Sequence, residues 1–298
     1  MWKQSVNLIL TVLEIVSPVF LLAAIGFIWV KTGNEYRIEF VTKLTMTLSV
    51  PALIFTALTN AQIDPAALTK LSIATIACYG IATVVMYVAV KLLKLEMRTF
   101  LNPLIFGNVG NLGLPLAYFA FGNEGLSYAV IVFAVMAIWS FTFGVYITAG
   151  GGSVWTAVKE PLVGATVLGT AFLWQGWTLP KFAMNTLELL GQVAIPIMLI
   201  TLGVAVARLA PSRLGRAMAL SIFKALICTA IAVLLGRGFG LTSTPYAVLI
   251  LQITTPVAVT SYLLAEKYGA DANEVAGLVV ASTVLSVFYL PLLLAFVV

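Results

Sequence analysis

Long apolar segments run along the whole chain and set the strongest limit on its fold. Polar breaks separate ten of them, and most are close to the roughly 20 residues that a helix needs to cross a bilayer. With 61% hydrophobic and only 9% charged residues, the chain leaves no stretch for a separate soluble domain. The sequence therefore predicts an all-α integral membrane protein with ten transmembrane helices. The predicted spans are 6–30, 38–59, 69–93, 99–121, 125–149, 157–175, 183–207, 214–236, 244–265 and 272–297.

The residue inventory argues against an enzyme. The chain has no histidine, which excludes a His-ligated zinc, an HExxH motif and a Ser-His-Asp triad. Its two cysteines, Cys78 and Cys228, fall within apolar spans, where we interpret them as small buried hydrophobic residues. No paired aspartates and no nucleophile–base spacing occur. We therefore expect no catalytic residue, no metal site and no bound cofactor.

Positive charge is concentrated in alternate connections between the spans. The net charge of +5 indicates membrane topology rather than a nucleic-acid surface, because the positive-inside rule places basic connections in the cytoplasm. The sequence thus predicts a multi-pass plasma membrane protein, of the bacterial inner membrane type, with both termini on the non-cytoplasmic side. Eleven of the sixteen Lys and Arg residues follow odd-numbered spans: Lys31, Arg37, Lys43, Lys91, Lys94, Arg98, Lys159, Arg208, Arg213, Arg216 and Lys267.

Prolines recur at a nearly constant offset. Self-similarity at a long period indicates a duplication, and five spans in each copy make the two copies cross the membrane in opposite senses. We predict two inverted five-helix repeats, 1–149 and 157–298, joined by a connector at 150–156; a duplicated channel or scaffold stays an alternative. Five pairs, 141 to 146 residues apart, use ten of the twelve prolines: Pro18 with Pro161, Pro51 with Pro196, Pro65 with Pro211, Pro103 with Pro245, and Pro115 with Pro256.

Two spans contain residues that do not suit a continuous helix. The stretch GNVGNLGLPLAYFAFG at 107–122 carries four Gly, two Asn and Pro115, and the stretch LQITTPVAVTSYLLAEKYG at 251–269 crowds polar residues around Pro256. In a helix interior each Gly costs roughly 1 kcal/mol and Pro about 3 kcal/mol relative to Ala. Interrupted backbone at bilayer depth is tolerated only where protein or a water-filled cavity covers it. We therefore predict two discontinuous helices whose freed peptide groups form a transporter's binding site.

Other polar or kinking residues inside the spans are weaker candidates. Glu14 is an intramembrane carboxylate that would carry a proton or help to bind a cation, or else lies near the outer interface. We interpret Lys224 as a side chain that snorkels toward the cytoplasmic headgroups, with anion binding as the alternative. Trp139 and Ser140 lie at mid-depth, where they would line a pocket. Kinks are expected at Pro51 and at its repeat partner.

Four sequence signatures resemble those of the auxin efflux carrier family, which includes the plant PIN proteins and many bacterial permeases. They are SVPALIF (49–55), NVGNLGLPL (108–116), AIWSF (137–141) and PVAVTSYLLAEKYG (256–269). The resemblance spans nearly the whole chain. The long cytoplasmic loop of many plant members is absent, so the chain resembles the compact, bacterial-type permeases.

This resemblance implies a ten-helix fold, similar to that of the bile-acid sodium symporters, with two subdomains. The first two spans of each repeat would form a scaffold, often a homodimer, and the other six a transport core that moves like an elevator. The broken helices 99–121 and 244–265 would cross within the core. Carried over residue by residue, the resemblance places five residues at the crossing: Asn108, Asn111, Pro115, Thr255 and Pro256.

Together these features predict a secondary transporter that moves a small organic anion, a carboxylate, across the membrane by alternating access. Two half-helix N-termini at the crossing would present free amides and positive dipole ends to the carboxylate. The asparagine side chains would add directional donors. The predicted substrate-binding residues are Asn108, Gly110, Asn111, Pro115, Trp139, Ser140, Thr255 and Pro256.

Two other functions are left open by the sequence. The first is a sodium-coupled symporter for organic or bile-acid-like acids, in which Gln252, Thr254, Thr255 and Glu14 would coordinate the ion. Coupling to Na⁺ or to H⁺ would use Glu14, Gln252 and Thr254 in either case. The second is a membrane receptor or channel for small acids, which would not show counterflow exchange.

Overall fold

The chain folds into a bundle of helices. The computed structural model describes residues 2–60, 65–151, 161–209 and 213–297. Within these ranges all regular secondary structure is helical apart from one isolated β-bridge, which confirms the predicted all-α class. In chain order the elements, with η for π-helical segments, are α1 (Trp2–Lys31), α2 (Ile38–Leu44), η1 (Thr45–Ser49), α3 (Val50–Thr59), α4 (Pro65–Leu92), α5 (Met97–Ile105), η2 (Val109–Gly113), α6 (Leu114–Trp139), η3 (Ser140–Gly144), α7 (Val145–Ala149), α8 (Pro161–Gln175), α9 (Lys181–Gln192), α10 (Ala194–Arg208), α11 (Leu214–Gly238), α12 (Ser243–Ile253), α13 (Val259–Tyr268) and α14 (Ala272–Val297).

Seven helical segments of the described residues are long and apolar enough to cross a membrane, against ten predicted spans. The difference arises at three places. Val109–Ala149 joins two predicted spans through Gly122, the predicted span 157–175 lies partly outside the described residues, and the span 244–265 is divided between α12 and α13. The count of ten crossings thus stays a prediction. The seven spans are Val12–Lys31, Ile38–Thr59, Ala66–Leu92, Val109–Ala149, Lys181–Arg208, Leu214–Gly238 and Ala272–Val297.

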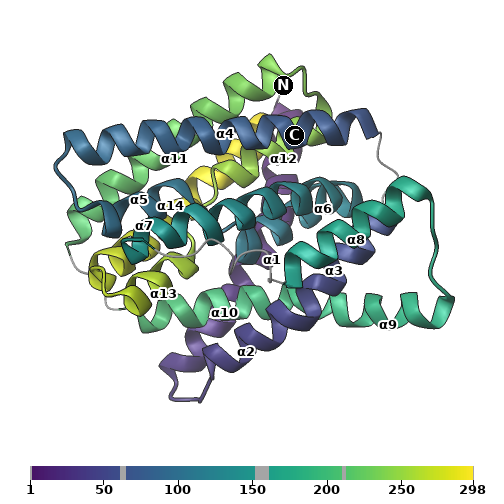
Figure 1. Cartoon of the computed structure of the whole chain (residues 1–298), viewed down its shortest axis with the longest axis horizontal. Helices are drawn as coiled ribbons and strands as arrows, with labels where there is room; N and C mark the ends of the chain where they lie inside the picture. Colours follow the sequence, from purple (N-terminus) through teal and green to yellow (C-terminus); the bar gives the residue numbers. More distant parts are fainter. Residues whose placement is uncertain (1, 61–64, 152–160, 210–212, 298) are drawn as a thin grey trace.

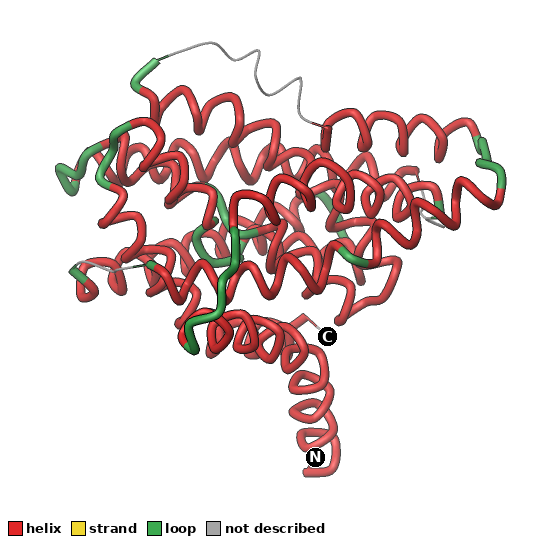
Figure 2. The backbone as a smooth tube through the Cα atoms, turned by 90° about the horizontal axis from the view of Figure 1, so that it is seen from below, coloured by secondary structure: helices red, strands yellow, loops and turns green. Residues whose placement is uncertain are grey.

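The helices pack in two groups. In the α1 group, α1 runs along α10, and α3 contacts α8 and α9. In the α11 group, α11 contacts α4, α12 and α14 (Figure 1). Helix α6 contacts members of both groups, so it lies between them. Figure 2 shows that the N-terminal part of α1 extends beyond the rest of the bundle.

Prolines occupy the junctions at which the helices change course. Pro51 and Pro115 each lie in the first two positions of an α-helix, directly after the π-helical segments η1 and η2. Proline lacks an N–H group and its ring clashes with the carbonyl four residues earlier, and the wider π turn removes that conflict. Helix α9 likewise ends before α10 begins, two residues ahead of Pro196. The kinks expected at Pro51 and Pro196 thus fall where the hydrogen-bonding pattern changes within the continuous helical segments Ile38–Thr59 and Lys181–Arg208.

The contact between α1 and α10 depends on two glycines. A Cβ atom built on Gly203 would collide with the carbonyl oxygen of Ala23, and one built on Gly26 would collide with the carbonyl oxygen of Ile200. The two backbones approach closely because neither glycine carries a side chain. Small residues at such interfaces are typical of membrane helices, where apolar burial does not drive association.

We expect the substitution Gly203→Ala to destabilise the protein by about 1–3 kcal/mol, because the added methyl group meets backbone atoms that cannot rotate away. Thermal unfolding of the purified protein in detergent measures the effect. Gly80→Ala is the matched control, since a Cβ at Gly80 in α4 has no neighbour within 4 Å. Equal melting temperatures for the two variants would contradict the close contact.

Candidate substrate site at the crossing of two interrupted helices

Two helical paths are interrupted, and their interrupted backbones meet inside the protein. The first path leaves helical geometry between α5 and η2, and the second between α12 and α13. The N–H of Asn108 donates a hydrogen bond to the carbonyl oxygen of Pro256 at 2.6 Å, and the N–H of Ala258 donates one to the carbonyl oxygen of Phe106 at 3.3 Å. Gly107 and Val257 form the isolated antiparallel bridge between them. We call residues 106–108 and 254–258 the crossing.

The first interruption lies at the start of the predicted stretch 107–122 and not at its proline. Phe106 is extended, with φ −93° and ψ 128°, and Asn108 has φ −79° and ψ 55°. Pro115 instead fits the beginning of α6 after the π turn. In the second path Pro256 is part of the interruption itself. Pro256 therefore lies within the second interruption, whereas Pro115 lies after the first one, in the helix that follows it.

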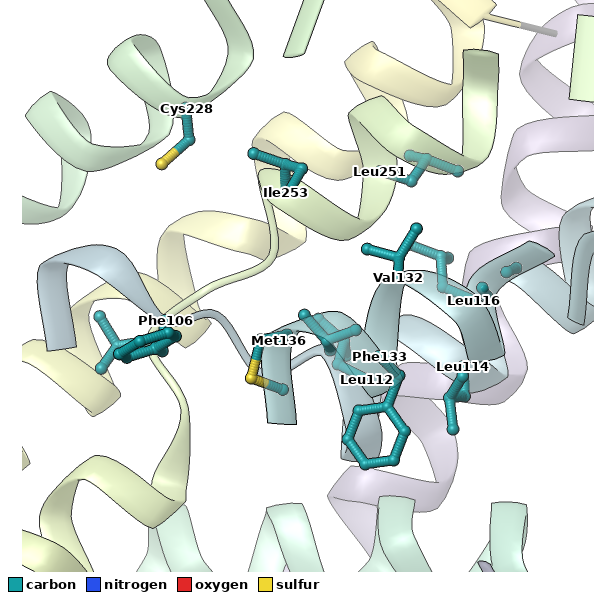
Figure 3. Packing of buried hydrophobic residues seen from close by; sticks show 14 of the residues in the cluster. Phe106, Leu112, Leu114, Leu116, Val132, Phe133, Met136, Cys228, Leu251 and Ile253 are labelled. Atoms are coloured by element: carbon teal, nitrogen blue, oxygen red, sulfur yellow. The ribbon is translucent and has the colours of Figure 1, made fainter. Parts of the chain in front are cut away.

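Two glycines explain how closely the paths approach, and a third packs against α6. A Cβ built on Gly107 would collide with the hydroxyl of Thr255, and one built on Gly113 would collide with the side-chain amide of Gln252. A Cβ on Gly110 would lie 3.1 Å from the Cε2 atom of Phe133. Figure 3 shows Phe106, Leu112, Phe133 and Ile253 packed around this region. The glycines are thus needed for contact as well as for interrupting the helix.

Each interrupted path begins again at a helix N-terminus with free amides. The first intrahelical acceptor after the break is the carbonyl oxygen of Asn108, which accepts from the N–H groups of Leu112 and Gly113 at 3.1 Å. The N–H groups of the residues just before Leu112, including Gly110 and Asn111, have no earlier turn to bind. The same reasoning applies to the first residues of α13. Two positive helix ends therefore begin at the crossing.

The interrupted C-terminal end of α12 is closed by side chains. The hydroxyl of Thr255 donates to the carbonyl oxygen of Gln252 at 2.7 Å, and the hydroxyl of Tyr289 donates to the carbonyl oxygen of Thr254 at 2.9 Å. The hydroxyl of Ser282 accepts from the N–H of Val257 at 2.9 Å. The roles of Tyr289 and Ser282 were not predicted, because only the folded chain brings α14 to the crossing.

The crossing contains buried amide groups that lack partners. Asn108 is 5% exposed, and its Nδ2 has no hydrogen-bond partner within the described part of the chain. Gln252 is fully buried, and both polar atoms of its side chain are unpaired in the same sense. Buried polar atoms without a partner are rare and costly. Asn108 and Gln252 therefore offer hydrogen-bonding capacity that a ligand would use.

The structure brings together most, but not all, of the predicted substrate-binding residues. Asn108, Gly110, Asn111 and Pro115 follow one another through η2 into α6, and Thr255 and Pro256 meet them at the crossing. Trp139 and Ser140 lie at the junction of α6 and η3. The Nε1 atom of Trp139 is buried and has no partner among the described residues.

The predicted ion-coupling residues are not gathered in one place. Glu14 is exposed on α1, whereas Gln252 is buried on α12 and Thr254 is buried directly after it. The hydroxyl of Thr254 lies 3.3 Å from that of Thr229, and the hydroxyl of Thr255 is bound within its own segment. A sodium site that uses Glu14 together with these residues is not assembled in this conformation.

Lys224 corrects a prediction. It does not snorkel to the surface, because its side chain lies on the inner face of α11 and the residue is only 2% exposed. This face is covered by α4, α12 and α14, which pack on α11. The sequence alone could not predict that these three helices bury the lysine.

A cavity of about 550 Å³ lies between helices of the α1 group and α6. It lies between α3, α6, α9 and α10, and Tyr118 and Phe119, the first residues of α6 to line it, follow Pro115 closely. Among the described residues that line it, Glu188 is the only charged one, and it accepts a hydrogen bond from Asn60 at 3.1 Å. None of the eight predicted substrate-binding residues lines the cavity, so the cavity does not contain the crossing.

The sequence was compared with known proteins. The model of the family described as membrane transport protein matches residues 11–153 and again residues 150–294. The chain belongs to this family. The match confirms the resemblance to the auxin efflux carriers, and together with the apolar helices it identifies a multi-pass membrane transporter.

Two archaeal proteins are similar to this transporter. An uncharacterized transporter of Methanothermobacter thermautotrophicus is 26% identical over 294 residues, which cover 94% of this chain and 96% of that protein. The uncharacterized transporter MJ1031 of Methanocaldococcus jannaschii is 26% identical over 205 residues, covering 63% of this chain and 64% of that protein. Neither name states a substrate.

The contact between Gly113 and Gln252 in the transporter predicts a specific rescue. We expect Gly113→Ala to destabilise the protein by about 1–3 kcal/mol, because the new methyl group meets the Gln252 amide. Adding Gln252→Ala removes that amide, so the double variant should recover part of the loss. Thermal unfolding of the four proteins gives the coupling free energy.

Gly107→Ala is the control, because no side-chain truncation should rescue it. Its methyl group would also meet the backbone oxygen of Thr255, at 3.0 Å, which stays in place in any such variant. Strictly additive effects of Gly113→Ala and Gln252→Ala would show that the two residues do not touch.

Proposed function

We propose that this transporter is a secondary carrier that moves a small organic anion, a carboxylate, by alternating access. The observation that supports this most directly is the meeting of two helix N-termini at a buried crossing, next to the unpaired Nδ2 of Asn108. Helix N-termini are favourable sites for anions because their amides and dipoles point at the ligand. Broken helices that meet near the bilayer midplane are typical binding sites of secondary transporters.

The carboxylate is held by groups that carry no formal charge. The first amides of η2 and α13 bind its oxygens, and Asn108 and Asn111 give it a direction. Gly110 lets the ligand approach the backbone, while Pro115, Thr255 and Pro256 keep the two helix ends in place. Trp139 and Ser140 line the apolar part of the site. Such fixed dipoles suit release as well as binding, because no strong ion pair has to be broken.

Transport follows from relative movement of the two packing groups. The α1 group contains the helices of the predicted scaffold, and the α11 group contains helices of the predicted core. The cavity between α3, α6, α9 and α10 is the route by which the substrate reaches the crossing from one side. Movement of the core along the scaffold then exposes the crossing to the other side, as in an elevator.

The same proposal includes the arrangement of the chain in the membrane. Two inverted five-helix repeats, 1–149 and 157–298, cross the membrane ten times, and both termini are non-cytoplasmic. The scaffold forms a homodimer in the plasma membrane. The recurring prolines and the alternating basic connections support this topology.

Sodium coupling is a second candidate, and one observation favours it. The Oε1 atom of Gln252 is fully buried and accepts no hydrogen bond from the described residues. An amide oxygen in that position suits a hard cation. Uptake into proteoliposomes with and without a sodium gradient separates a symporter from a carrier that uses no sodium.

We expect Asn108→Ala to weaken carboxylate binding by about 10- to 100-fold, since a hydrogen bond to a charged group contributes roughly 1.5–3 kcal/mol. The measurement is binding and counterflow with purified protein in proteoliposomes, using labelled dicarboxylates, aromatic acids and bile acids. Counterflow distinguishes a carrier from a receptor or channel. Asn185→Ala, which removes an exposed amide from α9 outside the cavity lining, is the control.

The melting temperature of Asn108→Ala should stay close to that of the parent protein, because the Nδ2 atom has no described partner to lose. Unchanged carboxylate affinity in a folded Asn108→Ala protein would refute the assignment of this residue. Binding without counterflow would refute the carrier.

A further inference from the structure

A buried lysine on α11 has no counterion among the described residues. Lys224 is 2% exposed, and its Nζ atom has no hydrogen-bond partner among the described residues. The salt bridges of the described part of the chain involve other residues, and no described carboxylate lies within 4.0 Å of this ammonium. A charge inside the membrane region is costly unless something compensates it. The position of Lys224 therefore calls for a compensating group.

Two other buried donors, one on α11 and one on the helix that packs against it, also lack partners among the described residues. Ser221 lies three residues earlier on the same buried face of α11, and its Oγ atom is buried and unpaired in the described structure. The hydroxyl of Tyr79, on the neighbouring helix α4, is buried and unpaired in the same way. Cys228, one turn after Lys224, is buried on the same face of α11, and α4 packs against this helix.

All of these groups offer hydrogens and none offers negative charge. An ammonium has three N–H donors, each hydroxyl has one O–H donor, and a neutral thiol is a weak donor. Three unpaired donors in one dry cluster are unfavourable when the cluster is empty. A bound anion would satisfy them together and would neutralise the lysine.

The cluster lies apart from the proposed substrate path. Helix α11 packs against α4, α12 and α14, whereas the cavity lies between α3, α6, α9 and α10. Figure 3 shows Cys228 on α11 at the side of Ile253, at the end of α12. The ring of Tyr79 stacks on that of Phe106 with 6.0 Å between centroids, so Tyr79 contacts a residue of the crossing.

The nearby arginines do not contribute to this cluster. Arg216, on the same helix, pairs with Glu274, and Arg98 donates to the carbonyl oxygens of Thr148 and Tyr268. The donor set is therefore a single point charge with two hydroxyls, without the planar fork of arginine that matches a carboxylate. It suits a small spherical anion better than a planar one.

We propose that Lys224, Ser221 and Tyr79 bind one small monovalent inorganic anion of the chloride class inside the α11 group. The anion neutralises the buried ammonium and stabilises the packing of α4 on α11, behind the crossing. This site requires neither a carboxylate substrate nor transport, so its test does not depend on the proposed function.

The test is the thermal stability of the purified protein in detergent as sodium gluconate is replaced by sodium chloride at constant sodium. We expect the melting temperature of the parent protein to rise with chloride and then saturate, as linkage requires. Lys224→Met should lose this response and should be at least as stable as the parent protein without chloride. Lys91→Met, which removes an exposed lysine from α4, should keep the response.

Two milder variants keep the test informative if Lys224→Met does not fold. Tyr79→Phe and Ser221→Ala each remove one donor, and each should raise the chloride midpoint about tenfold, as expected for a hydrogen bond to a charged group. Bromide should replace chloride in the titration. Its anomalous scattering in crystals should lie beside the Nζ atom of Lys224.

Other results would overturn the proposal. A parent protein that does not respond to chloride, or a folded Lys224→Met variant that still responds, would show that the ammonium binds no such anion. A response to benzoate that depends on Lys224, with none to chloride, would replace the inorganic anion with a carboxylate. Asn108→Ala should keep its chloride response, so failure of the substrate site is distinguished from failure of this one.

Discussion

The structure depends on two peptide hydrogen bonds at the crossing. Where a helix is interrupted inside a membrane, its N–H and C=O groups find no water, and each must be paired by other protein groups. Here the interrupted paths pair with each other, through Asn108 with Pro256 and Ala258 with Phe106. The approach that permits these bonds requires glycine at 107, because any side chain there would meet Thr255. Helix α14 completes the pairing with a serine and a tyrosine hydroxyl.

A crossing that is secured in this way leaves a limited set of groups for a ligand. The carbonyl end of α12 is satisfied by the protein, whereas the helix beginnings after both interruptions keep free amides. The resulting site is rich in donors on the side of η2. On the side of α4 and α11, the buried lysine and the hydroxyls of Ser221 and Tyr79 are further donors without partners among the described residues. Both faces of the crossing thus favour negative charge, but the first would hold it by dipoles and the second by an ammonium.

The sequence predicted what depends on local chemistry. Apolar segment lengths identified the helical membrane protein, and glycine, asparagine and proline identified the two stretches that cannot form continuous helices. What the sequence did not predict also has a physical reason. Pro115 was expected to mark a break, but the π turn of η2 accommodates it, and the break occurs where Gly107 meets a distant segment. The burial of Lys224 likewise depends on three helices that cover one face of α11, which spacing along a single helix does not reveal.

The measurement that tests the central claim most directly is an experimentally determined structure of the transporter with a carboxylate from the ligand panel bound. Our account predicts that the carboxylate oxygens lie within hydrogen-bond distance of the Asn108 side chain and of the first amides of η2, with the crossing intact. A ligand bound elsewhere in the protein, with no contact to residues 106–111, would contradict it.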